Sequence, residues 1–249
     1  MKYSWILAAI LAWPAILTAQ SALPAGTILP VSLDKTVDVR KVHPGQEIQA
    51  RVMQDIPGSS IRRGARVLGH VVESSLSTNG QARLSIRFDS VTQHGESAPI
   101  ATNLRALASF LEVEEAQVPE DMSSRGLTPD TWTTQQIGGD EVYRGGGPVA
   151  AGLEPVGEST FYGVLGRPLA QYGEACRGVV ADASRPQAFW LFSTSACGVY
   201  GYAGVRIQHS GRTDPVGVIV LVSDNGKLNL RVGSGMLLRV QEPPVTAHS

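Results

Sequence analysis

The chain has 249 residues, of which 43% are hydrophobic, and a formal net charge of −1. A charge so close to zero gives no electrostatic reason to expect nucleic acid or an anionic membrane surface as a partner. The length suits one large β domain or two small ones. The 27 glycines and 15 prolines are typical of many short strands joined by tight turns.

Residues 1–21 have the layout of a secretory signal peptide. One lysine precedes an uncharged run from Trp5 to Leu17, and small and polar residues follow that run. The run is shorter than the roughly 20 residues that a membrane-spanning helix needs. We therefore expect cleavage near Ser21, a periplasmic or extracellular protein, and no membrane-spanning segment after cleavage.

Residues 22–100 are expected to form a first β segment. Apolar and polar residues alternate along the stretch 82–91, which is typical of a half-buried antiparallel strand. Asn79-Gly80 and His94-Gly95 lie where hairpin turns are needed, because glycine adopts a positive φ without steric cost. The side chains expected to face inward from that strand are Leu84, Ile86 and Phe88.

Residues 101–157 are expected to form an insertion that is first helical and then irregular. Apolar residues between Asn103 and Gln117 follow helical spacing, and acidic residues gather towards the end, which predicts one amphipathic helix with a solvated acidic face. The glycine-rich stretch 144–152 lacks the lysine and Ser/Thr of a nucleotide-binding loop. We interpret it as a connector.

Residues 158–240 are expected to form a second β segment that completes the same domain, with residues 241–249 as a flexible tail. Asp224-Asn225-Gly226 lies between two strand-like runs and predicts a hairpin. The stretches GTILPV (26–31) and GMLLRV (235–240) are alike, and pairing the first strand with the last would close a barrel. The expected fold is mainly β, an antiparallel barrel or sandwich with a helix-plus-loop insertion.

The first β segment resembles the β-barrel domain of TrbI-like subunits, which build the outer-membrane core of conjugative type IV secretion systems. The resemblance covers residues 23–100 and consists mostly of turn and strand positions, so it speaks to fold more than to role. The positions that carry it are Gly26-Thr27, Pro44-Gly45, Gly64-Ala65-Arg66, Gly69, and Gly95 with Pro99-Ile100. The resemblance implies a barrel that assembles with copies of itself or with other envelope proteins.

The chain departs from that family in several places. Arg62 and Arg63 replace the usual Pro-Lys type of loop, and a cleavable signal replaces the family's inner-membrane helix and proline-rich spacer. The helix expected after Thr102 is too short and too acidic to span lipid, so pore formation is not carried over. A similar segment recurs in uncharacterised secreted proteins of environmental bacteria, to which the whole chain is closer.

The two cysteines, Cys176 and Cys197, are expected to form a disulfide bond. Outside the cytoplasm a pair of cysteines is normally oxidised, and a separation of 21 positions across a turn suits a staple between adjacent strands. A redox pair would more often be Cys-x-x-Cys, and a zinc site would need further ligands nearby. A Cys-His dyad with His209 is the alternative left open.

Two further groups of residues are candidates for a site. The stretch HSGRTD (209–214) contains the residue types of a hydrolase triad in His209, Ser210 and Asp214, although a hairpin loop explains it more simply. Trp190, Tyr200 and Tyr202 belong to an aromatic cluster that would bind sugars or peptides if it were exposed.

The densest basic cluster, Arg62, Arg63 and Arg66, is expected to guard a strand edge against unwanted pairing rather than to bind phosphate. The residues suggest no cofactor and no metal site, and His43 and His70 are not grouped with carboxylates in the sequence.

These observations favour a non-enzymatic structural or binding module of the cell envelope, with an assembly scaffold as one form of it. The alternative is a secreted carbohydrate-binding protein or hydrolase that uses the aromatic cluster and the HSGRTD stretch. Enzymatic activity is therefore left open, and a non-enzymatic role is favoured.

Overall fold

A computed structural model describes residues 23–117, 120–121, 132–135, 141–144, 148–151, 154–158, 188–193 and 196–242. The expected signal peptide, residues 159–187 of the expected second β segment, and residues 243–249 of the expected tail lie outside these ranges. Within the described residues the protein is mainly β, with one short helix. The expected fold class is confirmed.

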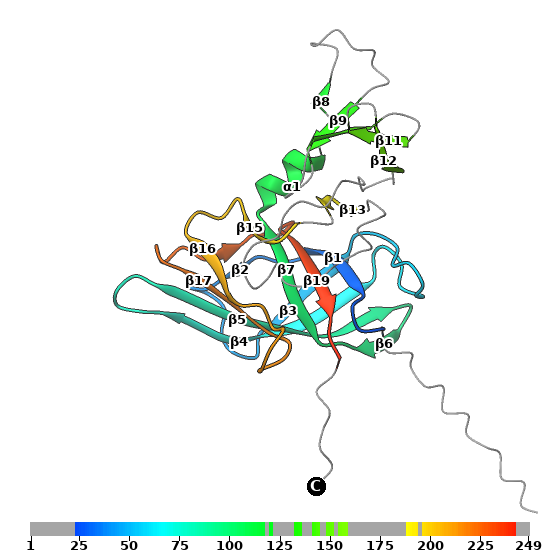
Figure 1. The fold of residues 1–249 in the computed structure, drawn as a ribbon. Helices are drawn as coiled ribbons and strands as arrows, with labels where there is room; N and C mark the ends of the chain where they lie inside the picture. Colours follow the sequence, from blue (N-terminus) through cyan, green and yellow to red (C-terminus); the bar gives the residue numbers. More distant parts are fainter. Residues whose placement is uncertain are drawn as a thin grey trace, which may run out of the picture.

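A single ten-stranded sheet curls into a nearly closed barrel of mostly antiparallel strands (Figure 1). Strands from both expected β segments share this sheet, which therefore joins the two halves of the chain. Neighbours along the sheet follow the order β15 (Gly198–Tyr200), β7 (Thr102–Ala108), β19 (Gly235–Val240), β1 (Ile28–Leu33), β3 (Glu47–Val52), β4 (Arg66–Leu76), β5 (Ala82–Gln93), β17 (Val218–Ser223) and β16 (Val205–His209), while β6 (Glu96–Pro99) pairs with β5.

The expected pairing of the first and last barrel strands is present. β1 and β19 run antiparallel side by side, from Ile28 opposite Arg239 to Ser32 opposite Gly235 (Figure 1). β1 pairs with β3 on its other side, and β19 pairs with β7. Both strands therefore lie inside the sheet, and the barrel comes together elsewhere.

The two ends of the sheet, β15 and β16, meet beside β7. β15 pairs with β7 in parallel, and the backbone N–H of Leu104 in β7 donates to the carbonyl of Ser210, just after β16, at 2.7 Å. A second bond runs from the Ser109 N–H to the Tyr200 carbonyl at 3.0 Å. These contacts leave the barrel nearly closed.

Apolar side chains fill the barrel interior. Leu84, Ile86 and Phe88 are buried as expected from their alternation, with at most 1% of each exposed. They pack in one continuous core with apolar residues from β1, β3, β4, β7, β17 and β19. Because small barrels are stabilised by such packing, the interior is a core and not a channel.

The helix expected over residues 103–117 is wrong in its first half. Residues 102–108 form β7, and every one of them is buried. The strand sequence TNLRALA is not an unbroken apolar run, and its Leu104, Leu107 and Ala108 also fit helical spacing, so periodicity alone did not distinguish this strand from a helix. Only α1 (Phe110–Gln117) is helical, so the sheet extends past the expected boundary at residue 101.

The hairpin turns of the first segment are confirmed, whereas the one expected in the second is not. Asn79-Gly80 joins β4 to β5, with a φ of 82° at Gly80, and His94 and Gly95 join β5 to β6 with φ values of 51° and 86°. The turn at Asp224-Asn225-Gly226 exists, but the strand after it, β18 (Asn229–Leu230), pairs with β2 (Val37–Asp38) and not with β17.

The region expected to be irregular contains further strands. Figure 1 shows α1 leaving one end of the barrel and a small separate sheet beyond it. A two-stranded unit of β13 (Ala188–Phe189) and β14 (Phe192–Ser193) lies near β1. The small sheet has the order β12 (Glu154–Glu158), β11 (Pro148–Ala151), β10 (Glu141–Arg144), β9 (Trp132–Gln135) and β8 (Glu120–Asp121).

Gly69 in β4 tests how closely the strands approach one another. A Cβ atom at Gly69 would lie 2.0 Å from the Arg87 carbonyl oxygen, at a bulge in the β4–β5 pairing. We expect Gly69→Ala to lower the free energy of unfolding by about 3 kcal/mol, because backbone must move to admit the methyl group. Urea unfolding followed by circular dichroism measures this change.

Gly45→Ala is the matched control. Gly45 has a φ of 82° and no atom within 4 Å of its would-be Cβ, so its cost comes from backbone conformation alone, about 1–2 kcal/mol. Equal losses in the two variants would contradict the steric explanation for Gly69.

Candidate binding surface

The aromatic residues around Trp190 are buried and do not form an exposed platform. Trp190 and Phe192 are both 0% exposed, and their rings meet edge to face with centroids 6.2 Å apart. The Trp190 backbone N–H donates to the Gln54 side chain, which ties this segment to the end of β3. Trp190 therefore packs rather than stacks on a ligand.

This aromatic segment covers the outer face of the barrel at β1, β19 and β7. We call it the outer cap and define it as Phe189, Trp190, Leu191, Phe192 and Val113 of α1. The cap packs against side chains that point away from the barrel interior, namely Ile28, Ala106, Ala108 and Leu237. It explains why β7 is buried on both faces.

The two candidate tyrosines belong to different parts of the structure. Tyr200 packs against the outer cap, and its hydroxyl accepts a hydrogen bond from the Cys197 N–H at 3.0 Å. Tyr202 packs against the barrel core and hydrogen bonds to the Ser234 hydroxyl at 2.6 Å. Burial raises the pKa of both tyrosines, so they stay neutral. They do not form one binding surface.

The disulfide stays a prediction, because Cys176 lies outside the described residues. Cys197 precedes β15, next to the buried Ala196.

The HSGRTD stretch forms the loop of the β16–β17 hairpin. Nδ1 of His209 lies 2.8 Å from the Val218 carbonyl and 3.1 Å from the Gly211 N–H, and its Nε2 lies 3.3 Å from the Thr213 hydroxyl. Asp214 is exposed. Among the described contacts His209 is thus used to hold its own loop, and the histidine–serine contact of a hydrolase triad is not formed.

Arg105 is a buried charge that the sequence analysis did not single out. Its side chain is 2% exposed, at a bulge where β7 pairs with β19. Burial, and then the charge of Arg239, lower the pKa of Arg105 to about 10, against an opposing effect of Tyr200. The guanidinium therefore remains protonated at neutral pH. The sequence analysis expected one helix over residues 103–117, and for that reason it did not predict that Arg105 is buried in a strand.

His70 is grouped with charged residues, contrary to the sequence analysis. Nδ1 of His70 on β4 lies 2.7 Å from Oδ2 of Asp89 on β5, and Arg87 Nε lies 3.2 Å from Oδ1 of the same carboxylate. Counting back from the Asn79-Gly80 turn would place residue 89 opposite residue 70, but bulges in the β4–β5 pairing put Arg87 opposite His70 and leave Asp89 as the extra residue at a bulge.

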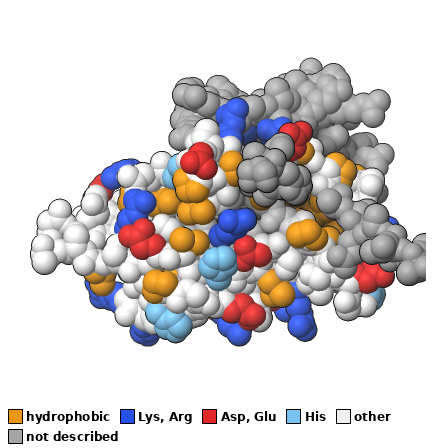
Figure 2. Space-filling view, turned by 90° about the horizontal axis from the view of Figure 1, so that it is seen from below, with side chains coloured by type: hydrophobic (Ala, Val, Ile, Leu, Met, Phe, Trp, Pro, Cys, Tyr) orange, Lys and Arg blue, Asp and Glu red, His pale blue; other side chains and the backbone are white. Residues whose placement is uncertain are grey.

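The outer surface seen from below is mixed in character (Figure 2). On the face seen from below the barrel, side chains of both charges and histidines are interspersed with small apolar areas (Figure 2).

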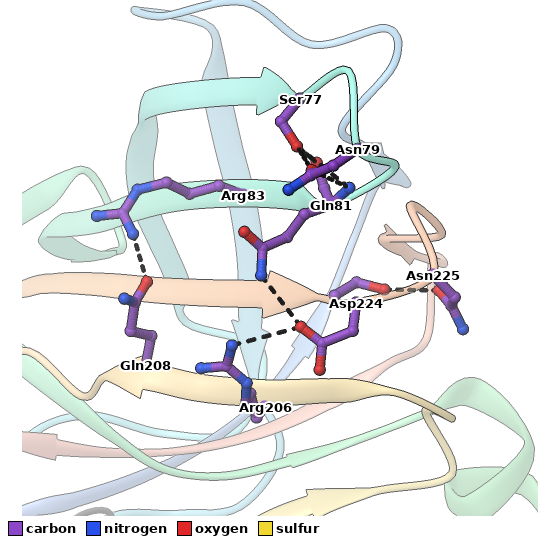
Figure 3. A network of polar contacts seen from close by, with 9 residues as sticks. Ser77, Asn79, Gln81, Arg83, Arg206, Gln208, Asp224 and Asn225 are labelled. Atoms are coloured by element: carbon purple, nitrogen blue, oxygen red, sulfur yellow. Dashed lines mark hydrogen bonds and ion pairs between the residues drawn. The ribbon is translucent and has the colours of Figure 1, made fainter.

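A polar network joins the tip of the β4–β5 hairpin to β16 and β17 (Figure 3). The Asp224 carboxylate accepts hydrogen bonds from Gln81 at 3.1 Å and from Arg206 at 3.4 Å, and Arg83 donates to Gln208 nearby. Hydrogen bonds from Gln81 and Arg206 lower the pKa of Asp224 below its ordinary value. The network holds three strands together at the surface.

A row of outward-facing polar residues crosses five neighbouring strands near the other rim. We call it the outer polar row: Ser32 of β1, Arg51 of β3, Arg66 of β4, Thr92 of β5 and Ser97 of β6. Each lies directly opposite the next in the register of the sheet. The cluster of Arg62 and Arg63 lies in the loop that leads into Arg66.

Arg66, the one arginine of this cluster that lies in a strand, is not on an edge strand. Arg66 begins β4, which pairs with β3 on one side and with β5 on the other. In the described sheet β6, beside the loop of Arg62 and Arg63, pairs with β5 alone, so edge protection by these two arginines stays a prediction.

Comparison of the chain with protein-family models, curated proteins and solved structures found no match. In the described ranges, none of the helical structure is long and apolar enough to cross a membrane. The same residues contain no group of three or more His, Cys, Asp or Glu side chains placed to hold a metal ion.

Removal of Trp190 tests the outer cap. We expect Trp190→Ala to lower the free energy of unfolding by about 3–5 kcal/mol, because it leaves a cavity under Phe192. Leu111→Ala, in α1 and 66% exposed, is expected to change it by no more than about 0.5 kcal/mol. A Trp190→Ala protein as stable as wild type would show that the cap is not packed as described.

The pH dependence of unfolding tests the network of Figure 3. A carboxyl group whose pKa is lower in the folded chain stabilises the fold above its ordinary pKa, and this contribution is lost as the pH falls through the folded pKa. We therefore expect the urea midpoint of wild type to exceed that of Asp224→Asn at neutral pH and the difference to shrink in acid. Gln81→Met, which removes the strongest hydrogen-bond cause, should reduce the wild-type dependence in part. Parallel pH profiles for wild type and Asp224→Asn would contradict the assignment.

Proposed function

We propose that the protein is a non-enzymatic, secreted or periplasmic structural or binding module of the cell envelope that assembles through its barrel. The observation that supports this proposal most is the filled interior. Because apolar side chains from strands throughout the barrel occupy it, contacts with partners are left to the outer surface and the rims. A rigid barrel with a mixed outer face suits a scaffold.

The proposed relation to TrbI-like barrels draws support from the turns. Gly26, Gly45, Gly64 and Gly95 carry the resemblance, and each has a φ between 82° and 91°. Residues other than glycine rarely adopt such φ values, so the shared positions are those that shape the loops of the barrel. The support concerns fold, and the proposed role in assembly goes beyond it.

The alternative of a hydrolase or carbohydrate-binding protein built on the candidate aromatics and HSGRTD finds less support. Trp190 is buried, and Tyr200 and Tyr202 pack against different hydrophobic clusters. His209 contacts the Val218 carbonyl within its own hairpin. The structure offers no converging set of these residues among those described.

The solution mass of the purified protein tests assembly. Light scattering coupled to size-exclusion chromatography is expected to give a discrete multimer, whereas a monomer at every concentration would contradict the scaffold proposal.

The same run with reductant tests the proposed Cys176–Cys197 bond. Closing that loop would stabilise the fold by roughly 3 kcal/mol, so reduction should expand the protein or lower its thermal midpoint. A Cys176→Ser/Cys197→Ser variant, insensitive to reductant, is the control.

A further inference from the structure

Four of the five residues of the outer polar row line a trench made of two adjoining hollows, and Ser97 lies outside it. One hollow of about 580 Å³ is lined by Arg62, Arg63, Arg66, Thr92 and His94, between the β3–β4 loop and the β5–β6 turn. A second hollow of about 410 Å³ continues it past Arg63 to Arg51, Asp34 and Ser32. Four strands at about 4.8 Å spacing make the part of the row that lines the trench roughly 14 Å long.

Positive charge dominates the trench although the whole chain is nearly neutral. Its lining contains four guanidinium groups, from Arg51, Arg62, Arg63 and Arg66, and one carboxylate, from Asp34. Asp34 lies 3.3 Å from Arg51. Arg51 and Arg66 lie directly opposite one another on adjacent strands, and the Asp34 carboxylate offsets only part of their charge.

Hydroxyl groups flank the arginines. The Thr92 hydroxyl donates to Ser97 at 3.2 Å on one side of Arg66, and Ser32 lies beside Arg51 on the other. Guanidinium groups bind carboxylate, sulfate or phosphate groups through paired hydrogen bonds, and hydroxyl groups add neutral donors and acceptors. This combination suits a ligand that carries both charges and hydroxyl groups.

We propose that the trench binds an anionic polysaccharide, laid along the outer polar row across β1, β3, β4 and β5. This inference rests on the proposed binding role and names its ligand class. A thread-like chain fits a trench between two loops, whereas a flat bilayer would meet the loops first. A peptide that adds a strand needs free backbone groups, and β3, β4 and β5 are each paired on both sides.

Fluorescence anisotropy with labelled heparin, a sulfated polysaccharide used as the probe, tests the proposal. We expect Arg62→Gln/Arg66→Gln to weaken binding at least about fivefold and to flatten its salt dependence, because two charge contacts are lost. Lys41→Gln/Lys227→Gln removes the same charge from exposed positions outside the trench and is expected to bind as wild type does. Thermal unfolding of both variants checks that they fold, and Arg66→Glu provides a second test within the trench.

Each outcome is decisive. Equal weakening in the two double variants would show that only net charge matters and would overturn the proposal. Tighter binding to phosphatidylglycerol vesicles or to polyglutamate than to heparin would overturn the choice of ligand class. A multimer that does not bind heparin would reject this inference and leave the scaffold proposal standing. A monomer that binds heparin through Arg62 and Arg66 would support this inference and contradict the scaffold proposal.

Discussion

The antiparallel pairing of β1 with β19 is the constraint on which the barrel depends. It joins residues 28–32 to residues 235–239, so the other barrel strands all lie between the two paired strands in the sequence. Leu29 and Val31 of β1 meet Met236 and Leu238 of β19, and all four are completely buried. Contacts between residues so far apart in sequence carry a large entropic cost of loop closure, which the burial of these side chains must offset.

The outer cap adds a second hydrophobic layer over the same strands. Gly235 of β19 has no side chain, and a Cβ there would lie 3.2 Å from both Trp190 and Phe192. The cap therefore rests directly on the β1–β19 pair. It also accounts for the complete burial of β7, including Arg105, whose charge is retained in a position where burial opposes it.

The outer cap and the outer polar row meet on β1. Ser32, the first residue of the row, lies opposite Gly235, on which the cap packs. The barrel thus has one apolar outer sector that the chain covers itself and, next to it, a basic sector that it leaves exposed. That division of the outer face is what connects the fold to the proposed binding of an anionic ligand.

The sequence by itself determined the β class, the hairpins at Asn79-Gly80 and His94-Gly95 and the pairing of the two end strands, because alternation and turn residues act locally and the matching ends can be compared directly. Tertiary structure alone decided that residues 102–108 form a strand, since their apolar residues also fit helical spacing and it is the pairing with β15 and β19 that makes them a strand. It likewise decided that the strand after Asp224 pairs with β2, that Trp190 is covered, and that Arg51 lies opposite Arg66. These properties depend on which distant segments meet, and no local pattern of residues records that.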